Sequence, residues 1–185
     1  MPDWVNVANA LTLLRLLLVP WIIETIARGQ HVLGLALFMV AAWTDLFDGM
    51  AARSLGKTTR AGERLDPIAD KCLLSGVFLA LAFAGSISWW VVAVVFGRDL
   101  AILLGAVLLM RRTTVRDFPP SWWGKISTFT QIVTVVSWMA ANAFPSAFTS
   151  GFAAFILWPC VTMTIWSGAH YAWRGSRIWK ARPRN

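Results

Sequence analysis

Long apolar runs separated by short polar breaks make up most of this chain. An apolar run of about 20 residues is long enough to cross a bilayer as a helix. The pattern predicts six membrane-spanning helices, at roughly residues 11–28, 32–53, 67–85, 89–110, 124–143 and 151–173. The breaks are rich in Gly, Pro and Ser, which favour turns. We therefore expect an all-α integral membrane bundle, with residues 1–185 forming a single domain.

The composition supports lipid as the solvent for this bundle. Hydrophobic residues make up 57% of the chain and charged residues 14%, whereas soluble domains average about 45–50% apolar and about 25% charged. Twelve residues are Trp, which favours the membrane interface. The net charge of +8 comes from basic residues between apolar runs, so it indicates attraction to a membrane surface rather than binding to nucleic acid.

Basic residues occur in alternate connections between the predicted helices. Lys and Arg accumulate in short loops on the cytoplasmic side of membrane proteins. Residues 53–64, residues 111–116 and a basic tail at about 174–185 carry most of the positive charge, whereas the other connections hold little more than Arg28 and His31. We therefore expect both termini in the cytoplasm, in a multi-pass protein of a bacterial inner membrane.

Carboxylates concentrate where the second predicted helix ends and the third begins. Four of the nine acidic residues lie there: Asp45, Asp48, Asp66 and Asp70. Spacings of three and four residues place each pair on one helical face, and antiparallel neighbouring helices would bring the two pairs together. Converging carboxylates repel one another unless cations bind, and Mg²⁺ and Mn²⁺ prefer oxygen ligands. The cluster predicts a site for two divalent cations that grip a diphosphate.

Other readings of these carboxylates remain open. Asp66 precedes Pro67 and is typical of an N-cap followed by Pro at the first helical position, so capping would be part of its role. A membrane cation transporter also keeps carboxylates inside its spans, although it usually distributes them along a path. An intramembrane prenyltransferase shares the Asp-x-x-Asp pattern but generally needs a longer chain. For a purely structural membrane protein, replacing all four Asp residues by Asn would be harmless.

The spacing of this segment resembles a known family motif. The chain reads Asp45-Leu-Phe-Asp48-Gly49-Met-Ala-Ala52-Arg53, then eight residues, then Gly62-Glu-Arg-Leu-Asp66-Pro-Ile-Ala-Asp70. This run resembles the D-x2-D-G-x2-A-R-x8-G-x3-D-x3-D motif of the CDP-alcohol phosphatidyltransferases, and every fixed position is present. The family also has six spans and works as a homodimer, so the resemblance implies both features here.

The resemblance implies transfer of a phosphatidyl group from CDP-diacylglycerol to an alcohol, with release of CMP. If these residues have the roles of the matching positions in the family motif, Asp45, Asp48 and Asp66 would ligate two divalent cations, Mg²⁺ or Mn²⁺. Asp70 would be the general base and would also touch a metal. The nucleotide and diphosphate would be held by Gly49, Ala52, Arg53 and Gly62. The chain is thus expected to be an enzyme of phospholipid biosynthesis.

The acceptor alcohol is predicted from residues of the fourth and fifth helices. Arg98 and Lys125 would bind an anion there, with Asp99 as the partner of Arg98 or an orienter of the acceptor. Phosphatidylglycerophosphate synthases of this family tend to read G-K-x-K-T-x-x-Q in the fifth span and Arg-Glu in the fourth. This chain has Ser127 at the second Lys position and Arg98-Asp99 in place of Arg-Glu. These two differences favour phosphatidylglycerol as acceptor, as in cardiolipin synthases, with glycerol 3-phosphate as the alternative.

The cysteines and a lone histidine have simpler interpretations. Cys72 and Cys160 each lie in an apolar run without a second Cys or His at ligand spacing, so we expect both to be small core residues. His170 lies near the cytoplasmic end of the last predicted span, where we expect an interfacial hydrogen-bonding role.

Overall fold

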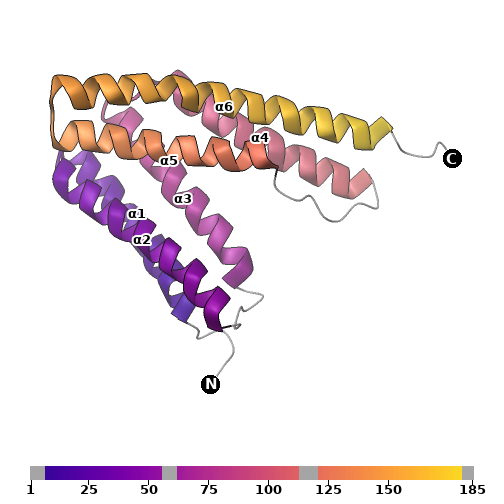
Figure 1. The fold of residues 1–185 in the computed structure, drawn as a ribbon, viewed down its shortest axis with the longest axis horizontal. Helices are drawn as coiled ribbons and strands as arrows, with labels where there is room; N and C mark the ends of the chain where they lie inside the picture. Colours follow the sequence, from indigo (N-terminus) through magenta and orange to yellow (C-terminus); the bar gives the residue numbers. More distant parts are fainter. Residues whose placement is uncertain (1–6, 56–61, 113–120, 181–185) are drawn as a thin grey trace. The chain divides into compact units, whose positions relative to one another are not determined.

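The computed structural model describes residues 7–55, 62–112 and 121–180, with side chains described for 11–44, 68–109 and 121–179. These parts of the chain contain six helices and no strand (Figure 1). The helices are α1 (Val7–Ala27), α2 (His31–Leu55), α3 (Gly62–Phe83), α4 (Trp89–Arg112), α5 (Trp122–Ala143) and α6 (Ala147–Lys180). Each predicted apolar segment coincides with one of them, so the all-α prediction is confirmed.

Two of the described helices are long and apolar enough to cross a membrane: Trp89–Leu109 in α4 and Ala147–Trp179 in α6. Large apolar side chains point outward from α4, including Leu103 and Leu104, which are 61% and 52% exposed. Such outward-facing leucines are suited to a lipid environment. A bundle of six spans, with both termini in the cytoplasm, remains a prediction.

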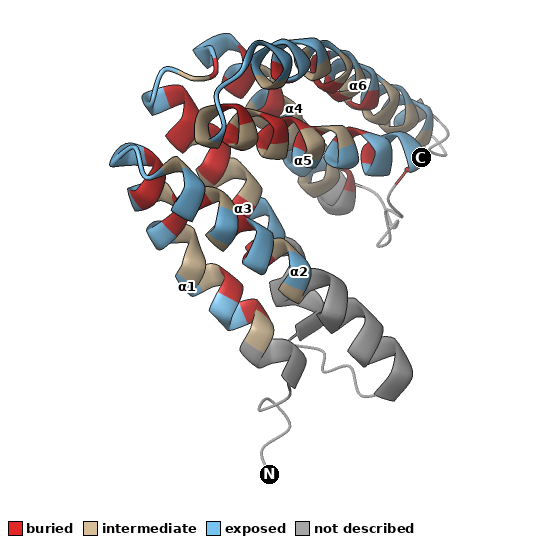
Figure 2. Cartoon of the chain, turned by 60° about the vertical axis from the view of Figure 1, so that its left-hand side comes forward, coloured by how far each residue is buried: buried red, intermediate tan, exposed pale blue. Residues whose placement is uncertain are grey.

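The chain divides into two compact units. The first comprises Met1–Ile87 and Val135–Ser150, and the second comprises Ser88–Thr134 and Gly151–Asn185. Helices α5 and α6 therefore each contribute to both units. In each unit the buried residues follow the helix faces that meet, while exposed residues follow the outer faces (Figure 2). The single domain over residues 1–185 remains a prediction.

Helix α1 forms the centre of the first unit, because it packs against both α2 and α3. Ile22 from α1, Phe38 from α2 and Phe78 from α3 are almost completely buried. Gly76 allows a close approach of α3, since a Cβ atom there would lie 3.2 Å from side-chain carbons of Val19 and Ile23. Gly29 and Gly85 lie just after α1 and α3 with φ of 71° and 73°, a left-handed conformation that favours glycine at helix ends.

Helix α4, the first part of α5 and most of α6 form the second unit. Polar side chains are buried where α5 meets α6, including Ser127, Gln131 and Thr164. Gln131 Nε2 donates a hydrogen bond of 3.1 Å to Thr164 Oγ1, and the Ser127 and Thr164 hydroxyls lie 3.3 Å apart. Because buried polar groups need partners, this network fixes the register of the two helices.

Several helix ends differ from the sequence prediction by four or more residues, and those of α3 and α6 bear on the site. Helix α3 begins at Gly62, so Asp66 lies inside the helix and its interpretation as an N-cap is wrong. Glu63, Arg64 and Leu65 favour helix, which explains the earlier start. Helix α6 continues to Lys180 and includes the first part of the predicted basic tail.

The cysteine prediction holds for one residue and fails for the other. Cys160 is fully buried, as expected, whereas Cys72 is exposed. The buried positions of α3 include Ala69, Leu73 and Val77, which recur every four residues. Cys72 lies outside that stripe and is exposed. Its apolar neighbours in sequence were therefore a poor guide to whether it is buried.

Candidate active site

The four aspartates occupy the predicted places along the backbone. Asp45 and Asp48 lie in the later part of α2, and Asp66 and Asp70 lie in the first turns of α3. The helical spacing places the members of each pair on one face. Several side chains fall outside the described residues: Asp45, Asp48, Gly49, Ala52, Arg53, Gly62 and Asp66. Their metal-binding and nucleotide-binding roles remain predictions, and the described side chains alone include no cluster of three potential metal ligands among His, Cys, Asp and Glu.

Asp70 is anchored by an arginine from the first helix. Arg15 Nη1 donates a hydrogen bond to Asp70 Oδ1 across the contact between α1 and α3. The Arg15 side chain is completely buried, whereas the Asp70 side chain is 51% exposed. A charged hydrogen bond of this kind stabilises the ionised carboxylate and restricts its rotation. Asp70 is therefore a fixed carboxylate with part of its surface available to a ligand.

The sequence interpretation missed this pairing, although a signal for it was present. Arg15 is the single charged residue in the apolar run from Ala10 to Ile23. A charge in such a run is costly in a membrane and usually has a partner or a function. The partner lies far away in sequence, so only the packing of α3 against α1 identifies it as Asp70.

Arg98 lies between α4 and α6 and is almost buried, with 9% of its side chain exposed. Its Nη1 donates a 2.8 Å hydrogen bond to Asp99 Oδ1, and its Nη2 donates a 2.7 Å bond to Ser167 Oγ. Its guanidinium carbon also lies 5.9 Å from the centroid of the Tyr171 ring. The expected pairing of Arg98 with Asp99 is confirmed, and these contacts join α4 to α6.

The start of α5 lies against this arginine. A Cβ atom at Gly124 would lie 3.1 Å from Tyr171 Oη and 3.4 Å from Arg98 Nη2, so only glycine fits without displacement. The Ser121 N–H donates a 2.8 Å bond to Tyr171 Oη, and Ser121 Oγ accepts a 3.1 Å bond from the Gly124 N–H. Ser121 therefore acts as the N-cap of α5 and is tied to α6.

Lys125 follows Gly124, and its side chain is exposed. Its Nζ lies 5.4 Å from the centroid of the Trp122 ring, an attractive cation–π arrangement. The structure thus brings the start of α5 to Arg98 and leaves the Lys125 ammonium accessible. By contrast, Ser127 is completely buried against α6, so this position has no open space for a long cationic side chain.

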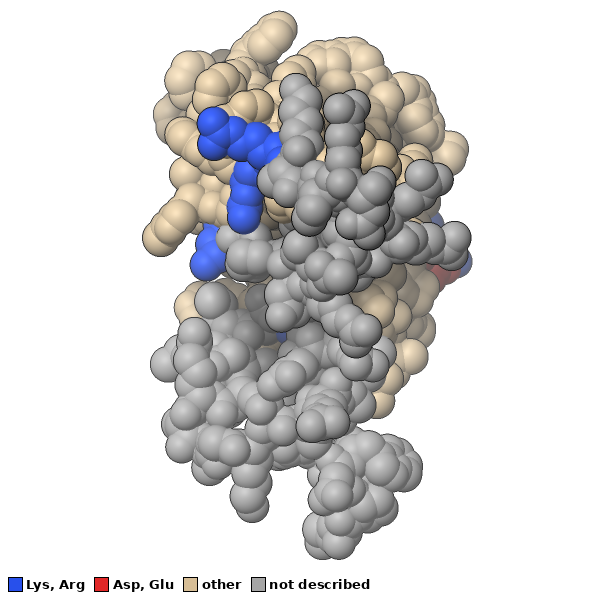
Figure 3. Space-filling view, turned by 90° about the vertical axis from the view of Figure 1, so that its right-hand side faces the viewer, with Lys and Arg blue, Asp and Glu red and all other residues tan. Residues whose placement is uncertain are grey.

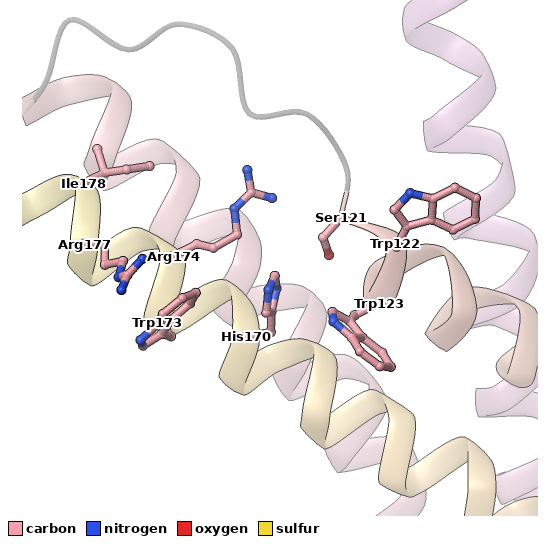
Figure 4. Close-up of a pocket in the computed structure, with 8 residues that line it drawn as sticks. All are labelled: Ser121, Trp122, Trp123, His170, Trp173, Arg174, Arg177 and Ile178. Atoms are coloured by element: carbon pink, nitrogen blue, oxygen red, sulfur yellow. The ribbon is translucent and has the colours of Figure 1, made fainter.

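A cavity of about 700 Å³ lies between the start of α5 and the later part of α6 (Figure 4). We call it the aromatic–basic pocket, and it is lined by Ser121, Trp122, Trp123, His170, Trp173, Arg174, Arg177 and Ile178. Figure 4 shows His170 and Arg174 projecting from α6 toward the start of α5. The sequence interpretation missed this pocket because it placed Arg174 and Arg177 in a tail beyond the last helix.

The interfacial hydrogen-bonding role expected for His170 stays a prediction. Its Nδ1 atom is buried and has no hydrogen-bond partner in the described part of the chain. The imidazole instead contacts aromatic rings, with centroid distances of 6.4 Å to Tyr171 and 6.0 Å to Trp173. The imidazole therefore packs among aromatic side chains at the wall of the aromatic–basic pocket.

Comparison with known proteins gives a family match over most of the chain. A family model described as CDP-alcohol phosphatidyltransferase matches residues 5–166. The matched range includes all four aspartates of the predicted cluster, together with Arg98 and Lys125. The α6 residues that line the aromatic–basic pocket follow the end of the match.

Individual relatives have related names. A "Probable phosphatidylglycerophosphate synthase" of Mycobacterium tuberculosis is 33% identical over 93% of this chain and 82% of its own length. A "CDP-diacylglycerol--glycerol-3-phosphate 3-phosphatidyltransferase" of Bacillus subtilis is 31% identical over 95% of this chain and 96% of its own. A "Probable cardiolipin synthase (CMP-forming)" of Drosophila melanogaster is 32% identical over 70% of this chain and 45% of its own.

Proposed function

Because this chain belongs to the CDP-alcohol phosphatidyltransferase family, we propose that it transfers a phosphatidyl group from CDP-diacylglycerol to glycerol 3-phosphate. The observation that supports glycerol 3-phosphate as the acceptor is the name of the Bacillus subtilis relative, which is similar along nearly its whole length. The cardiolipin synthase relative matches less of this chain. The preference for phosphatidylglycerol, which depended on Ser127 and Asp99, is therefore replaced by the alternative acceptor.

The aspartates are the proposed ligands of two divalent cations. The family generally works with divalent cations, and a set of carboxylate oxygens suits Mg²⁺ or Mn²⁺. The half-exposed carboxylate of Asp70 fits this chemistry, because part of it is open to a ligand. Bound cations would neutralise the diphosphate of CDP-diacylglycerol. Asp45, Asp48, Asp66 and Asp70 would hold them.

Asp70 is also the proposed general base. The acceptor hydroxyl oxygen attacks the phosphorus that carries diacylglycerol, and its proton passes to the Asp70 carboxylate. A new oxygen–phosphorus bond forms, the bond to the CMP oxygen breaks, and CMP leaves. Arg15 would hold Asp70 in the required orientation through the hydrogen bond between α1 and α3. The nucleotide would lie against Gly49, Ala52, Arg53 and Gly62.

The phosphate of the acceptor would bind near the start of α5. Lys125 is an exposed cation among the described residues of this region, and its ammonium is the proposed direct contact. Arg98 is almost buried and already bonded to Asp99 and Ser167. It therefore contributes positive charge and positions the start of α5 through the close contact with Gly124.

The proposed setting is a multi-pass protein of a bacterial inner membrane, with the site and both termini facing the cytoplasm. The length and apolar character of α4 and α6 support insertion, and the alternation of basic connections supports the orientation. A CDP-diacylglycerol headgroup would then meet the site from the cytoplasmic surface while its acyl chains remain in lipid. A homodimer is proposed from the family resemblance.

The proposal can be tested by measuring CMP release from CDP-diacylglycerol by the purified full chain in detergent with Mg²⁺ or Mn²⁺. Glycerol 3-phosphate should support release, whereas phosphatidylglycerol, serine and inositol should not. Removing the metal with EDTA should abolish release. Mass spectrometry of the lipid product identifies the acceptor. Release with phosphatidylglycerol alone would contradict the acceptor, and no release with any acceptor would contradict the donor.

Removing the proposed base gives a second test of the site. Asp70→Asn should lower turnover by about 100-fold or more, because general base catalysis typically contributes 10²–10⁴-fold. Glu24→Gln is the matched control, since Glu24 is an exposed acid on α1 whose ion pair is with Arg28. Full turnover in Asp70→Asn would show that another group accepts the proton.

A further inference from the structure

A hollow lies between α4 and α6 within the second unit. Side chains of α4 lie against the α6 backbone at two glycines: a Cβ atom at Gly168 would lie 3.3 Å from Arg98 Cγ, and one at Gly175 would lie 3.3 Å from Leu109 Cδ1. Although the helices meet at these points, a cavity of about 540 Å³ remains between them. We call it the apolar groove, and its lining residues lie at positions 101–109 of α4 and 168–179 of α6.

The groove is hollow because the residues that face it from both helices are small. Ala101, Gly105 and Ala106 line it from α4, and Ala172 and Gly175 line it from α6. A Cβ atom at Gly105 would lie more than 4 Å from every described atom beyond the adjacent backbone of its own helix, so packing within the chain does not require glycine there. Protein interiors contain few voids larger than a water molecule. A hollow of this size therefore indicates an occupant from outside the chain.

The chemistry of the groove favours an apolar occupant. Among the described residues, none that lines it is charged. Its two hydroxyl groups already have partners, because Tyr171 Oη accepts a 2.8 Å hydrogen bond from the Ser121 N–H and Ser176 Oγ donates a 2.8 Å bond to the Trp173 carbonyl oxygen. An ordered water molecule needs two to four polar partners, and a polar ligand has the same need. Neither is well served by this lining.

The length and position of the groove match one lipid chain. The apolar segments of α4 and α6 end at Leu109 and Trp179, and the groove reaches both residues. From Gly168 to Trp179 its α6 wall is about 16 Å long, at a rise of 1.5 Å per residue, and one leaflet of a hydrocarbon core about 30 Å thick measures about 15 Å. The indole of Trp179 favours the headgroup level, so the groove would run from that level into one leaflet.

The surface beside the groove is suited to contact with lipid. Leu108 lines the groove and is 56% exposed, and Leu103 and Leu104 of the same helix are also exposed. Uncharged residues form most of the described surface in the view of Figure 3. Lipid chains would therefore reach the groove without displacing a charged side chain from water.

We propose that the apolar groove binds one acyl chain of a resident bilayer phospholipid, with the ester end near Ser176 and Trp179 and the chain along Gly105 and Ala172. The surrounding lipid is as apolar as the groove, so the bound chain gains packing contacts with two helices rather than hydrophobic transfer energy. Recognition is by shape, and the headgroup is not selected. The α6 wall follows residues 5–166, which the family model matches, and this supports a lipid that takes no part in the transfer reaction.

Photolabelling of the full chain in liposomes tests this site. Phosphatidylcholine with a diazirine in one acyl chain is activated by light in the presence of EDTA, and fragmentation mass spectrometry locates the adducts. Residues 168–176 should carry adducts in the wild type. Gly105→Leu should lower their yield about tenfold, because the leucine side chain fills the hollow and a bound chain would then overpack it. Phosphatidylglycerol with the same diazirine should give the same yields.

Gly97→Leu is the matched control. Gly97 is an exposed glycine of α4 with open space around its Cβ position, and it does not line the groove, so this variant should be labelled like wild type. Equal melting temperatures show that the variants are folded. If Gly105→Leu is unstable, Ala101→Leu fills the groove from a neighbouring turn of α4 and should lower the yield in the same way. Unchanged labelling of a folded groove variant would overturn the proposal, and so would labelling by one headgroup alone.

Two further measurements on Gly105→Leu separate other occupants of the groove. Its oligomeric mass in detergent, measured by light scattering, should equal that of the wild type, and a loss of oligomer would assign the groove to a second copy of the chain and overturn the proposal. The KM for CDP-diacylglycerol should also be unchanged, and a selective rise would assign the groove to the donor and overturn the proposal. Photolabelling needs no turnover, so failure of the CMP assay with every acceptor would leave its result unaffected.

Discussion

At the scale of single residues, the pairing of Arg15 with Asp70 has the clearest consequence. A completely buried guanidinium fixes one oxygen of a carboxylate that is otherwise half exposed. Local periodicity predicts that both residues are helical, but it cannot join residues on two different helices. By contrast, the Arg98–Asp99 pair could be predicted from the sequence, because its members are adjacent and their charges are opposite.

Replacing Arg15 tests whether this contact positions the base. Arg15→Gln should lower kcat by about tenfold or more, because small displacements of a catalytic group reduce the rate steeply. The KM for glycerol 3-phosphate should change little, since Arg15 acts through Asp70 and is not among the residues proposed to bind the acceptor. Arg15→Lys should recover part of the rate. Loss of stability alone, with kcat of the folded fraction unchanged, would assign Arg15 a purely structural role.

At the scale of elements, the contact between α5 and α6 limits what the motif at the start of α5 can say about the acceptor. The run from Gly124 to Gln131 was compared with a motif that has a second lysine at position 127. Ser127 instead belongs to a buried network with Gln131 and Thr164. Its burial depends on α6, which no local pattern in α5 reveals, so the motif difference at position 127 could not be interpreted from α5 alone.

Replacing Ser127 by the lysine of the family motif tests whether position 127 is enclosed between α5 and α6. Ser127→Lys should destabilise the folded protein by about 3 kcal/mol, because it places an unpaired cation inside a packed interface. Thr128→Lys is the matched control, since Thr128 is an exposed neighbour on the same helix. Thermal unfolding in detergent measures both. Equal melting temperatures for the two variants would show that position 127 has access to solvent or to a ligand.

At the scale of the whole molecule, apolar patterning predicted the number and type of the described helices but not all of their ends. The apolar runs specify where a helix is buried in lipid, and they do not specify where helical hydrogen bonding stops. Good helix formers extend α3 backward to Gly62 and α6 forward to Lys180. The second extension is what brings Arg174 and Arg177 to the aromatic–basic pocket.

Reporter fusions test the proposed orientation of the chain. Alkaline phosphatase fused after Gln30 should be active, because the connection between α1 and α2 is expected outside the cytoplasm. Green fluorescent protein fused after residue 185 should be fluorescent, because the carboxyl terminus is expected in the cytoplasm. The positive-inside distribution of Lys and Arg is the physical basis for both results. The reverse pair of signals would invert the orientation and remove the cytoplasmic placement of the site.

The length of α6 sets a geometric limit on where its last turns can lie. With 34 residues and a rise of 1.5 Å per residue, the helix is about 51 Å long, whereas the hydrocarbon core of a bilayer is about 30 Å thick. Even a tilt of 40° leaves a vertical span of about 39 Å. A spanning α6 must therefore extend beyond the acyl chains, and the turns that carry Arg174 and Arg177 would then lie among hydrated headgroups, where a charged side chain needs no protein partner to remain ionised.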